Sequence, residues 1–322
     1  VAAGCGRPVK IDAAQAREPA SRADGQHSSK QLSWVKDDLG HVVMLPAAPR
    51  RVVSLSPNLT EVVFFLGAGD RLVGRTDFCD YPPEAIAVPS VGAIVMPSLE
   101  KVLALKPDLV LAAHGNDMSF IRRLRERKVP LFGVNPQNLE DVFSVMERLV
   151  LILGLGDAGR ERIEQLRREV TALRAEAATL NTRPSALVVV EMDPLFVAGS
   201  GSFVDDLLRE ARLTNAAVGE KPWAQWSGER LLASRADLLI FAHGHVGQRE
   251  GRNELLAAVR KRSPWRELPA VKAGHVYTVQ DDYITIPGPR LVKGLAALVE
   301  IHKTYSRAAS IARREAQNAA DP

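Results

Sequence analysis

Two glutamates take equivalent places in two similar stretches of this chain. Glu100 lies two positions after Ser98, and Glu229 lies two positions after Ser227. At both places the pattern predicts the first turn of a helix. A carboxylate there gains about 0.3–1 kcal/mol from the helix dipole, which is a sufficient structural reason for either residue alone. Two equivalent carboxylates on one outer face would also suit docking to a twofold-symmetric partner.

Aromatic residues form a second group. They make up only 5% of the chain, yet several fall in segments that we predict to be loops, where a place in the core explains them less easily. Together they could line a cleft for a large, flat and partly apolar ligand. Arg290 could donate to an acidic group of that ligand or cap a neighbouring carbonyl. The loop aromatics are Phe78, Tyr81, Phe196, Trp223, Trp226, Trp265 and Tyr283.

Histidines and a glycine-rich turn allow further chemistry. His114 and His243 end equivalent predicted strands, with His245 close by, and neutral imidazole is a common ligand of zinc or iron. A hydrogen-bonded or solvated histidine explains them more simply. The turn at 199–202, Gly-Ser-Gly-Ser, could bind a phosphate or carboxylate through its amides. It could equally be an ordinary strand-to-helix turn, which we favour.

Motifs and composition narrow the class of function. We find no Gly-x-Ser-x-Gly elbow, no His-Glu-x-x-His pair, no Walker lysine loop and no paired cysteines, so the sequence predicts no enzyme. The 42 basic and 38 acidic residues are spread along the chain without the clustering of a nucleic-acid-binding surface, so we expect no nucleic-acid partner. No apolar run reaches the roughly eighteen residues that suggest a membrane helix.

Residues 1–33 are expected to be a signal remnant and flexible leader. The first five, Val-Ala-Ala-Gly-Cys, are similar to a bacterial lipobox, which predicts lipidation of Cys5. Against this, Ala2 stands where leucine is usual, and such runs also occur by chance. The only other cysteine is Cys79, so a disulfide framework is not the source of stability. A lipid-anchored protein of this kind would lie in the periplasm or on the outer face of the cytoplasmic membrane.

One long helix is predicted near the middle of the chain. Residues 156–181 carry apolar side chains at alternating gaps of three and four, with charged residues on the other faces. About 24 residues at ~1.5 Å each would span roughly 36 Å, the width of a small domain. Such a helix could be a strut between two lobes or a surface helix on one domain. The length of 322 residues favours two domains.

An internal repeat lies on either side of this helix. Residues 98–115 and 227–244 match at a constant offset, each as a short helix and an apolar strand that runs into His-Gly. Strands with apolar runs alternate with helices, which indicates parallel sheets covered by helices. We therefore predict an α/β fold of two similar lobes, a first lobe at 34–155 and a second lobe at 184–305. Each has a small parallel sheet, and the one long α-helix joins them with the ligand cleft between.

Other elements follow from local patterns. A hairpin is expected over 33–45, a strand over 51–55, a helix over 60–66 and a second strand over 71–74. A polar tail, 306–322, follows the second lobe.

Five stretches of the chain carry a resemblance to a known family. In this order they resemble the substrate-binding proteins of the iron and cobalamin class of ABC importers, with a helical backbone between two lobes, and most of all its cobalamin-binding members. The resemblance covers residues 51–302, nearly all of the folded chain. The stretches are 51–61 (RVVSLSPNLTE), 80–84 (DYPPE), 98–110 (SLEKVLALKPDLV), 221–229 (KPWAQWSGE) and 287–290 (PGPR).

The resemblance implies roles for particular residues. It implies that Glu100 and Glu229 form salt bridges with arginines of two permease subunits. It also implies ligand contacts from a set of side chains on several loops. One departure affects the ligand: residues 93–95, Ala-Ile-Val, stand where the cobalamin binders carry a tryptophan. The implied ligand contacts are Phe78 or Tyr81, Phe196, Trp223, Asp282 and Arg290.

These observations lead to one expected function and two alternatives. We expect a monomeric extracytoplasmic receptor without cofactor or resident metal, which captures cobalamin, a large planar ligand, and delivers it to an ABC permease dimer with its ATPase subunits. A receptor for haem or an iron-siderophore complex is the alternative in the same class. A metal-ion receptor or metalloenzyme that uses His114 and His243 is the alternative of another class.

Overall fold

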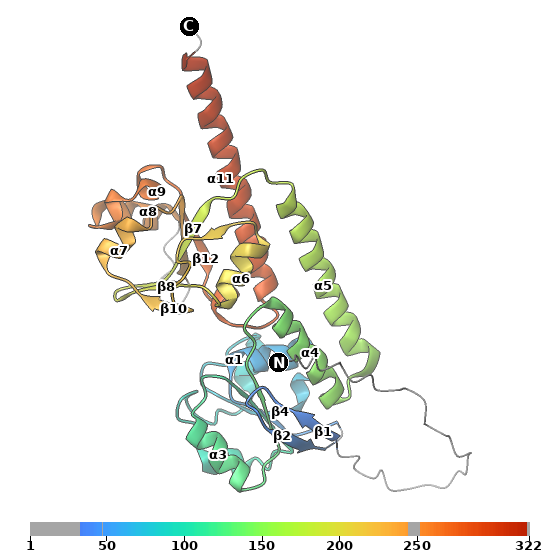
Figure 1. The fold of residues 1–322 in the computed structure, drawn as a ribbon. Helices are drawn as coiled ribbons and strands as arrows, with labels where there is room; N and C mark the ends of the chain where they lie inside the picture. Colours follow the sequence, from blue (N-terminus) through green and yellow to red (C-terminus); the bar gives the residue numbers. More distant parts are fainter. Residues whose placement is uncertain (1–32, 47, 244–251, 321–322) are drawn as a thin grey trace, which may run out of the picture. The chain divides into compact units, whose positions relative to one another are not determined.

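Two separate sheets organise the fold, one built from strands that precede a long helix in the chain and one from strands that follow it (Figure 1). The computed structural model describes residues 33–46, 48–243 and 252–320. Residues 1–30 and Gln31–Pro322 are separate units, and only the second is described below. Cys5, almost all of the leader and His245 lie outside the described residues, and of His243 only the backbone is described. The predicted fold class, two α/β lobes joined by a long helix, is confirmed.

The first lobe is built on a parallel sheet in the order β4-β3-β5-β6. Its central strand β5 is buried on both faces, because Leu109 and Leu111 pack in one hydrophobic cluster while Val110 and Ala112 pack in another. Helices α1 and α4 cover the first face, and α2 and α3 cover the second. The strands are β3 (Val52–Ser54), β4 (Leu72–Arg75), β5 (Leu109–Ala113) and β6 (Leu131–Val134), and the helices are α1 (Pro57–Phe65), α2 (Leu99–Ala104), α3 (Met118–Glu126) and α4 (Leu139–Leu153).

The predicted hairpin precedes this sheet. Strands β1 (Ser33–Lys36) and β2 (Val42–Leu45) pair antiparallel, and Gly40 in the turn has a φ of +84°, which glycine adopts without strain. Asp37, only 3% exposed, pairs with Arg125 of α3 at 2.7 Å. This buried ion pair attaches the hairpin to the first lobe.

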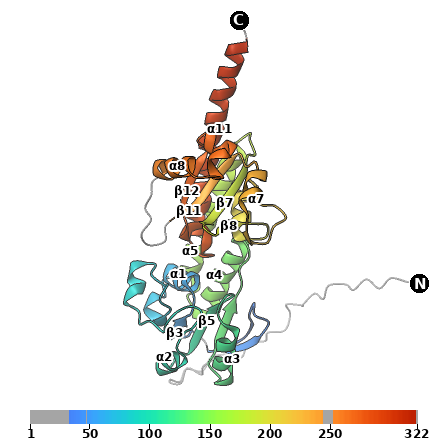
Figure 2. The same cartoon turned by 90° about the vertical axis from the view of Figure 1, so that its left-hand side faces the viewer.

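The second lobe repeats the parallel plan and adds to it (Figure 2). Its parallel strands run in the order β9-β7-β11-β12, which corresponds to β4-β3-β5-β6. Strands β8 and β10 add antiparallel, so this sheet of six strands is mixed rather than purely parallel. The strands are β7 (Ser185–Met192), β8 (Leu195–Ala198), β9 (Thr214–Asn215), β10 (Trp223–Gln225), β11 (Leu238–His243) and β12 (Val276–Gln280), and the helices are α6 (Phe203–Glu210), α7 (Gly228–Ala233), α8 (Arg252–Lys261), α9 (Pro269–Lys272) and α10 (Asp282–Thr285).

The internal repeat is confirmed at both of its helix starts. Ser98 Oγ accepts the backbone N–H of Lys101 at the start of α2, and Ser227 Oγ accepts the N–H of Arg230 at the start of α7. Such caps satisfy N–H groups that have no partner within the helix.

The two copies also share the link from helix to strand. Asp108 accepts the N–H groups of Arg50 and Arg51, which lead into the neighbouring strand β3. Asp237 accepts the N–H of Ser185, where the neighbouring strand β7 begins. Each aspartate therefore fixes two adjacent parallel strands at the end where they begin.

Two long helices run beside the sheets. Helix α5 (Gly156–Ala178) matches the predicted central helix and buries Ile163, Leu166 and Val170. Helix α11 (Leu291–Ala320) packs along α5 and continues past the boundary that we placed at 305, because the segment after it is rich in alanine and arginine, which favour a helix. None of the described helices has the length and apolar character needed to cross a membrane.

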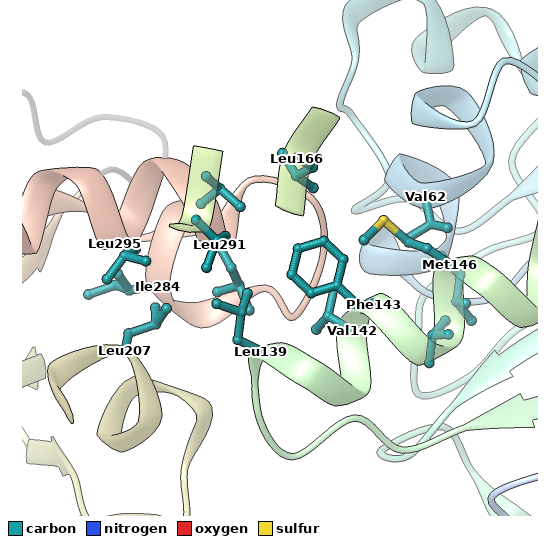
Figure 3. Close-up of a cluster of buried hydrophobic side chains, with 14 of the residues drawn as sticks. Val62, Leu139, Val142, Phe143, Met146, Leu166, Leu207, Ile284, Leu291 and Leu295 are labelled. Atoms are coloured by element: carbon teal, nitrogen blue, oxygen red, sulfur yellow. The ribbon is translucent and has the colours of Figure 1, made fainter. Parts of the chain in front are cut away.

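A continuous hydrophobic cluster joins the two lobes (Figure 3). Phe143 and Met146 of α4 pack near Val62 of the first lobe, while Leu139 at the start of α4 lies near Leu207 of the second. Leu139 also donates its N–H to the carboxylate of Asp206 at 2.8 Å. The connection is therefore thicker than the single helix that we predicted, because α4 and α11 contribute to it as well as α5.

Candidate functional site

A cavity of about 510 Å³, here called the cleft, lies between the lobes. The first lobe contributes the segments that follow β3, β5 and β6, which are adjacent parallel strands. Ligands of α/β proteins bind at this carboxyl edge of a parallel sheet. The second lobe contributes residues from the start of α6 and from β10, and the end of α10 with the segment after it completes the wall. The lining residues are Ser56, Asn58, Ala113, His114, Asn135, Pro136, Gln137, Gly201, Ser202, Phe203, Pro222, Trp223, Thr285 and Pro287.

The lining of the cleft combines polar and apolar side chains and is almost without charge. Hydroxyl and amide side chains dominate on the side of the first lobe, and two aromatic rings face them from the second. Among the described lining residues, His114 alone has a titratable side chain. The cleft therefore offers hydrogen bonds and aromatic surface, and its described walls contain no lysine or arginine to pair with an anionic group.

Buried hydrogen bonds fix the turn that carries His114. Asn116, only 5% exposed, accepts the N–H of Ala113 and donates to the carbonyls of Leu55 and Ile94. These bonds hold the end of β5 against two neighbouring segments. The His114 side chain itself is exposed in the cleft.

The aromatic wall comes from two elements of the second lobe. Trp223 on β10 is 42% exposed and meets Phe203 of α6 edge-to-face, with ring centroids 5.4 Å apart. Trp223 pairs with Ala198 of β8, so the backbone of a sheet positions the indole. We had predicted Phe196 and Trp223 in loops, but both lie on strands, because β8 and β10 form the antiparallel extension that the sequence pattern did not reveal.

The glycine-rich turn at 199–202 lies beside this wall. Ser202 Oγ accepts the N–H of Asp205, and the Asp205 carboxylate accepts the N–H of Gly201. The N–H groups of Gly199, Gly201 and Ser202 are thus bonded to other groups of the protein, in agreement with the ordinary strand-to-helix turn that we favoured. Gly199 is required there, since a Cβ would approach the Lys221 carbonyl to 2.1 Å.

A buried charge cluster lies beside the cleft, around Arg290. The guanidinium donates to both carboxylate oxygens of Glu61 in α1 and, at 2.9 Å, to Asp282. It also stacks over the ring of Tyr81, with 4.0 Å from Cζ to the centroid. Arg290 is therefore engaged by two carboxylates, rather than capping a carbonyl. Tyr81, Glu61 and Arg290 border a second cavity of about 580 Å³, next to α5.

The sequence analysis did not identify Glu61 as a residue of the site. It stands between Leu59 and Val62 on the buried face of α1, where an acidic residue needs a partner. Burial raises the pKa of Glu61 to about 7, and the hydrogen bonds and charge of Arg290 oppose this rise. Burial lowers the pKa of Arg290, but its bonds to Glu61 and Asp282 outweigh burial and raise the pKa above its usual range. An acidic residue among the otherwise uncharged residues of a buried helix was the signal that could have identified it.

The predicted ligand residues fall into three places. Trp223 lines the cleft, while Tyr81, Arg290 and Asp282 belong to the charge cluster. Phe78, which is 62% exposed, and Phe196 line neither cavity.

Two other loop aromatics are core residues. Trp226 and Trp265 are 7% and 2% exposed and pack in the core of the second lobe, so they do not line the cleft as predicted. Tyr283 lies in α10, with its ring 6.0 Å from the Arg290 guanidinium.

Glu100 and Glu229 are both exposed, in the first turns of α2 and α7. Among the described residues, neither carboxylate forms an ion pair or a hydrogen bond, so both are accessible to a partner. The described residues also contain no group of three or more histidine, cysteine or acidic side chains arranged to hold a metal ion.

Comparisons with known proteins agree with this architecture. A family model described as periplasmic binding protein matches residues 52–283. An uncharacterised ABC transporter substrate-binding lipoprotein of Bacillus subtilis, YvrC, is 29% identical over 92% of this chain and 91% of its own length. The Vitamin B12-binding protein of Vibrio parahaemolyticus is 28% identical over 80% of this chain and 90% of its own.

Solved structures show the same fold. The periplasmic Vitamin B12 binding protein BtuF of Vibrio cholerae superposes with a TM-score of 0.71 at 23% identity, over 81% of this chain and 99% of that one. The periplasmic heme-binding protein RhuT of Roseiflexus superposes with a TM-score of 0.69 at 27% identity, with the same coverage. The chain therefore belongs to the periplasmic binding protein family, whose members are substrate-binding proteins of ABC transporters and not enzymes.

Proposed function

We propose that this protein is the extracytoplasmic binding component of an ABC importer, that it captures a corrinoid, cobalamin in particular, and that it delivers this ligand to a permease dimer with its ATPase subunits. Relatives named as Vitamin B12-binding proteins support the ligand class. The name of the Bacillus relative, a lipoprotein, supports a lipid anchor on Cys5 and a place at the outer face of the membrane.

The composition of the cleft is the main support for cobalamin as the ligand. The periphery of cobalamin is rich in neutral amides, which match the hydroxyl of Ser56 and the amides of Asn135 and Gln137. Its flat macrocycle suits the face of Trp223. Haem, by contrast, carries two carboxylates, which the described cleft lining could not pair with a cation.

The size of the cleft adds a condition on binding. At about 510 Å³ it is smaller than a whole cobalamin, so the lobes must separate or the periphery of the ligand must extend out of the cleft. The thick apolar connection through α4, α5 and α11 favours a small hinge motion over a wide opening.

A haem receptor is the second candidate. The likeness to the Roseiflexus heme-binding protein supports it. So does Tyr81, whose phenol stands beside Arg290 at the second cavity and could ligate an iron atom.

Ligand titrations separate the two candidates. Cyanocobalamin should quench tryptophan fluorescence at micromolar concentration and raise the melting temperature, since a ligand at 100 times its Kd stabilises by about 2.7 kcal/mol. Haem and a ferric hydroxamate siderophore serve as the matched comparison. A flat response to cyanocobalamin with saturable binding of haem would assign the protein to the second candidate.

A further inference from the structure

Within the described part of the chain, the one titratable side chain of the cleft has no partner of its own. His114 is exposed in the cleft, and among the described residues its ring forms no hydrogen bond or ion pair. Its backbone N–H donates to the Val134 carbonyl at 2.8 Å. The imidazole is therefore available to a ligand, although the backbone that carries it is held in place.

The turn after His114 explains why this imidazole has a defined position. Gly115 takes a φ of +101°, and Asn116 folds back to bond the N–H of Ala113. Asn116 also bonds the carbonyl of Leu55, so the turn is tied to the strand on the other side. Because the backbone of His114 is held in place, its imidazole needs to adjust only two side-chain torsions to reach a ligand atom.

A macrocyclic metal complex needs only one such ring. A corrin supplies four equatorial nitrogens to its cobalt, which leaves two axial positions, and a neutral imidazole nitrogen is a good ligand there. Trp223 provides a flat surface in the same cavity, from the opposite lobe. The walls of the cleft thus hold a nitrogen ligand from one lobe and an aromatic ring from the other, both of which a flat metal complex can use.

We propose that His114 coordinates the cobalt of the bound corrinoid at an axial position. This inference rests on the proposed function. In the exchange, a ring nitrogen of the neutral imidazole donates its lone pair to Co(III), and the axial water leaves as a neutral molecule. The cobalt keeps its oxidation state, and no proton is transferred. The protein therefore prefers corrinoids with an exchangeable axial ligand over those with both axial positions occupied.

Two corrinoids test the coordination directly. In aquocobalamin one axial position holds a water, whereas in cyanocobalamin cyanide and the nucleotide base hold both. Aquocobalamin bound to the wild-type protein should show the visible absorption change that free imidazole causes when it replaces the water. His114→Ala should bind it without that change and about tenfold or more weakly, because loss of an outer-shell bond alone weakens metal sites 10–100-fold. Affinity for cyanocobalamin should stay within about twofold.

Matched variants and the outcomes complete the test. His41→Ala removes an exposed histidine outside the cleft and should retain the absorption change, and His114→Gln checks that loss of the ring rather than of volume matters. An unchanged water-type spectrum in the wild type, or equal aquocobalamin affinity in His114→Ala, would overturn the inference while leaving corrinoid binding intact. Failure of both corrinoids to bind the wild type would instead overturn the proposed function and the inference together.

Discussion

Arg290 binds both carboxylate oxygens of Glu61 although 229 residues separate them in the chain. Their side chains are 7% and 2% exposed. Glu61 belongs to α1 of the first lobe, and Arg290 precedes α11, which packs on the second lobe. The pair therefore joins the two lobes beside the cleft. A hinge motion between the lobes must either keep this ion pair or break it.

Removal of Arg290 should leave a buried acidic group without a partner. Arg290→Met should lower the free energy of unfolding by about 3–5 kcal/mol near pH 8, the usual effect of breaking a buried pair. The loss should be smaller near pH 5. Burial already raises the pKa of Glu61 to about 7, and without Arg290 this pKa rises further. Above the ordinary pKa of 4.5 the unfolded chain releases the Glu61 proton, whereas the folded variant keeps it, so the variant loses stability as the pH rises. Urea unfolding at both pH values measures the difference.

An exposed pair provides the control for this variant. Arg262 and Asp193 are 48% and 82% exposed, so Arg262→Ala should change stability by less than about 1 kcal/mol. The double variant Glu61→Leu with Arg290→Met should recover most of the loss, because no unpaired charge then remains buried. Equal losses in Arg290→Met and Arg262→Ala would contradict the interpretation of Arg290 as a buried link.

His302 should make stability depend on pH in the acid range. It is fully buried, its Nδ1 donates to the Ala211 carbonyl, and its Nε2 accepts the hydroxyl of Thr182. Burial lowers the pKa of His302 below 6.5, with Arg212 adding to the effect. The unfolded chain therefore takes up a proton that the folded state does not, and the free energy of unfolding falls as the pH drops below about 6.5.

The variant His302→Gln isolates this contribution. Below pH 6.5, the slope of its unfolding free energy against pH should be smaller than the slope of the wild type, by up to about 1.4 kcal/mol per pH unit. The two curves should be parallel near pH 8. Parallel curves over the whole range would show that His302 titrates alike in the folded and unfolded states.

The repeat could be predicted because its signals are local. A serine cap, a short helix, an aspartate and an apolar run all lie within eighteen residues of each other, and each acts on its own neighbours in the chain. The same holds for α5, whose apolar spacing sets its buried face. Interactions between residues that are close in the chain can be inferred from the sequence, and the structure contains these elements as predicted.

The site depends on longer-range pairings, which the sequence alone does not specify. Strands β8 and β10 pair across 24 or more residues, and without that pairing Trp223 looks like a loop residue. Glu61 and Arg290 meet only when both lobes are folded. Trp226 and Trp265 were misplaced for the same reason, since burial in the second lobe follows from the packing of several separate elements.

Asp108 and Asp237 should contribute equally to their lobes. Each accepts at least one backbone N–H at the beginning of a neighbouring strand, so Asp108→Ala or Asp237→Ala removes hydrogen bonds that are exposed to solvent and should lower the unfolding free energy by about 0.5–1.5 kcal/mol. Asp157 is the control, because its side chain is 98% exposed and Asp157→Ala should have little effect. Thermal unfolding is the measurement, and a loss in only one lobe would contradict the equivalence of the two aspartates.

Trp223 should contribute more to ligand binding than Phe78. Trp223 lines the cleft at 42% exposure, whereas Phe78, at 62%, lines neither cavity. Trp223→Ala should weaken cyanocobalamin binding by about 2 kcal/mol, the scale of an aromatic hot spot, and Trp223→Phe should recover part of this loss. Phe78→Ala should leave the Kd nearly unchanged. A larger loss from Phe78→Ala, measured by calorimetry, would place the ligand outside the cleft.

Glu100 and Glu229 should act only in delivery. Both carboxylates are exposed, in the first turns of α2 and α7, and neither lines the cleft, so the double variant Glu100→Ala with Glu229→Ala should bind ligand like the wild type. Uptake by the cognate permease should be abolished if each carboxylate meets an arginine there, since a docking ion pair is lost in each lobe. The double variant Glu126→Ala with Glu161→Ala removes two other exposed acids and should transport normally. Normal uptake with the first variant would mean that the repeat positions these glutamates for helix stability alone, because the helix dipole already favours a carboxylate at both sites.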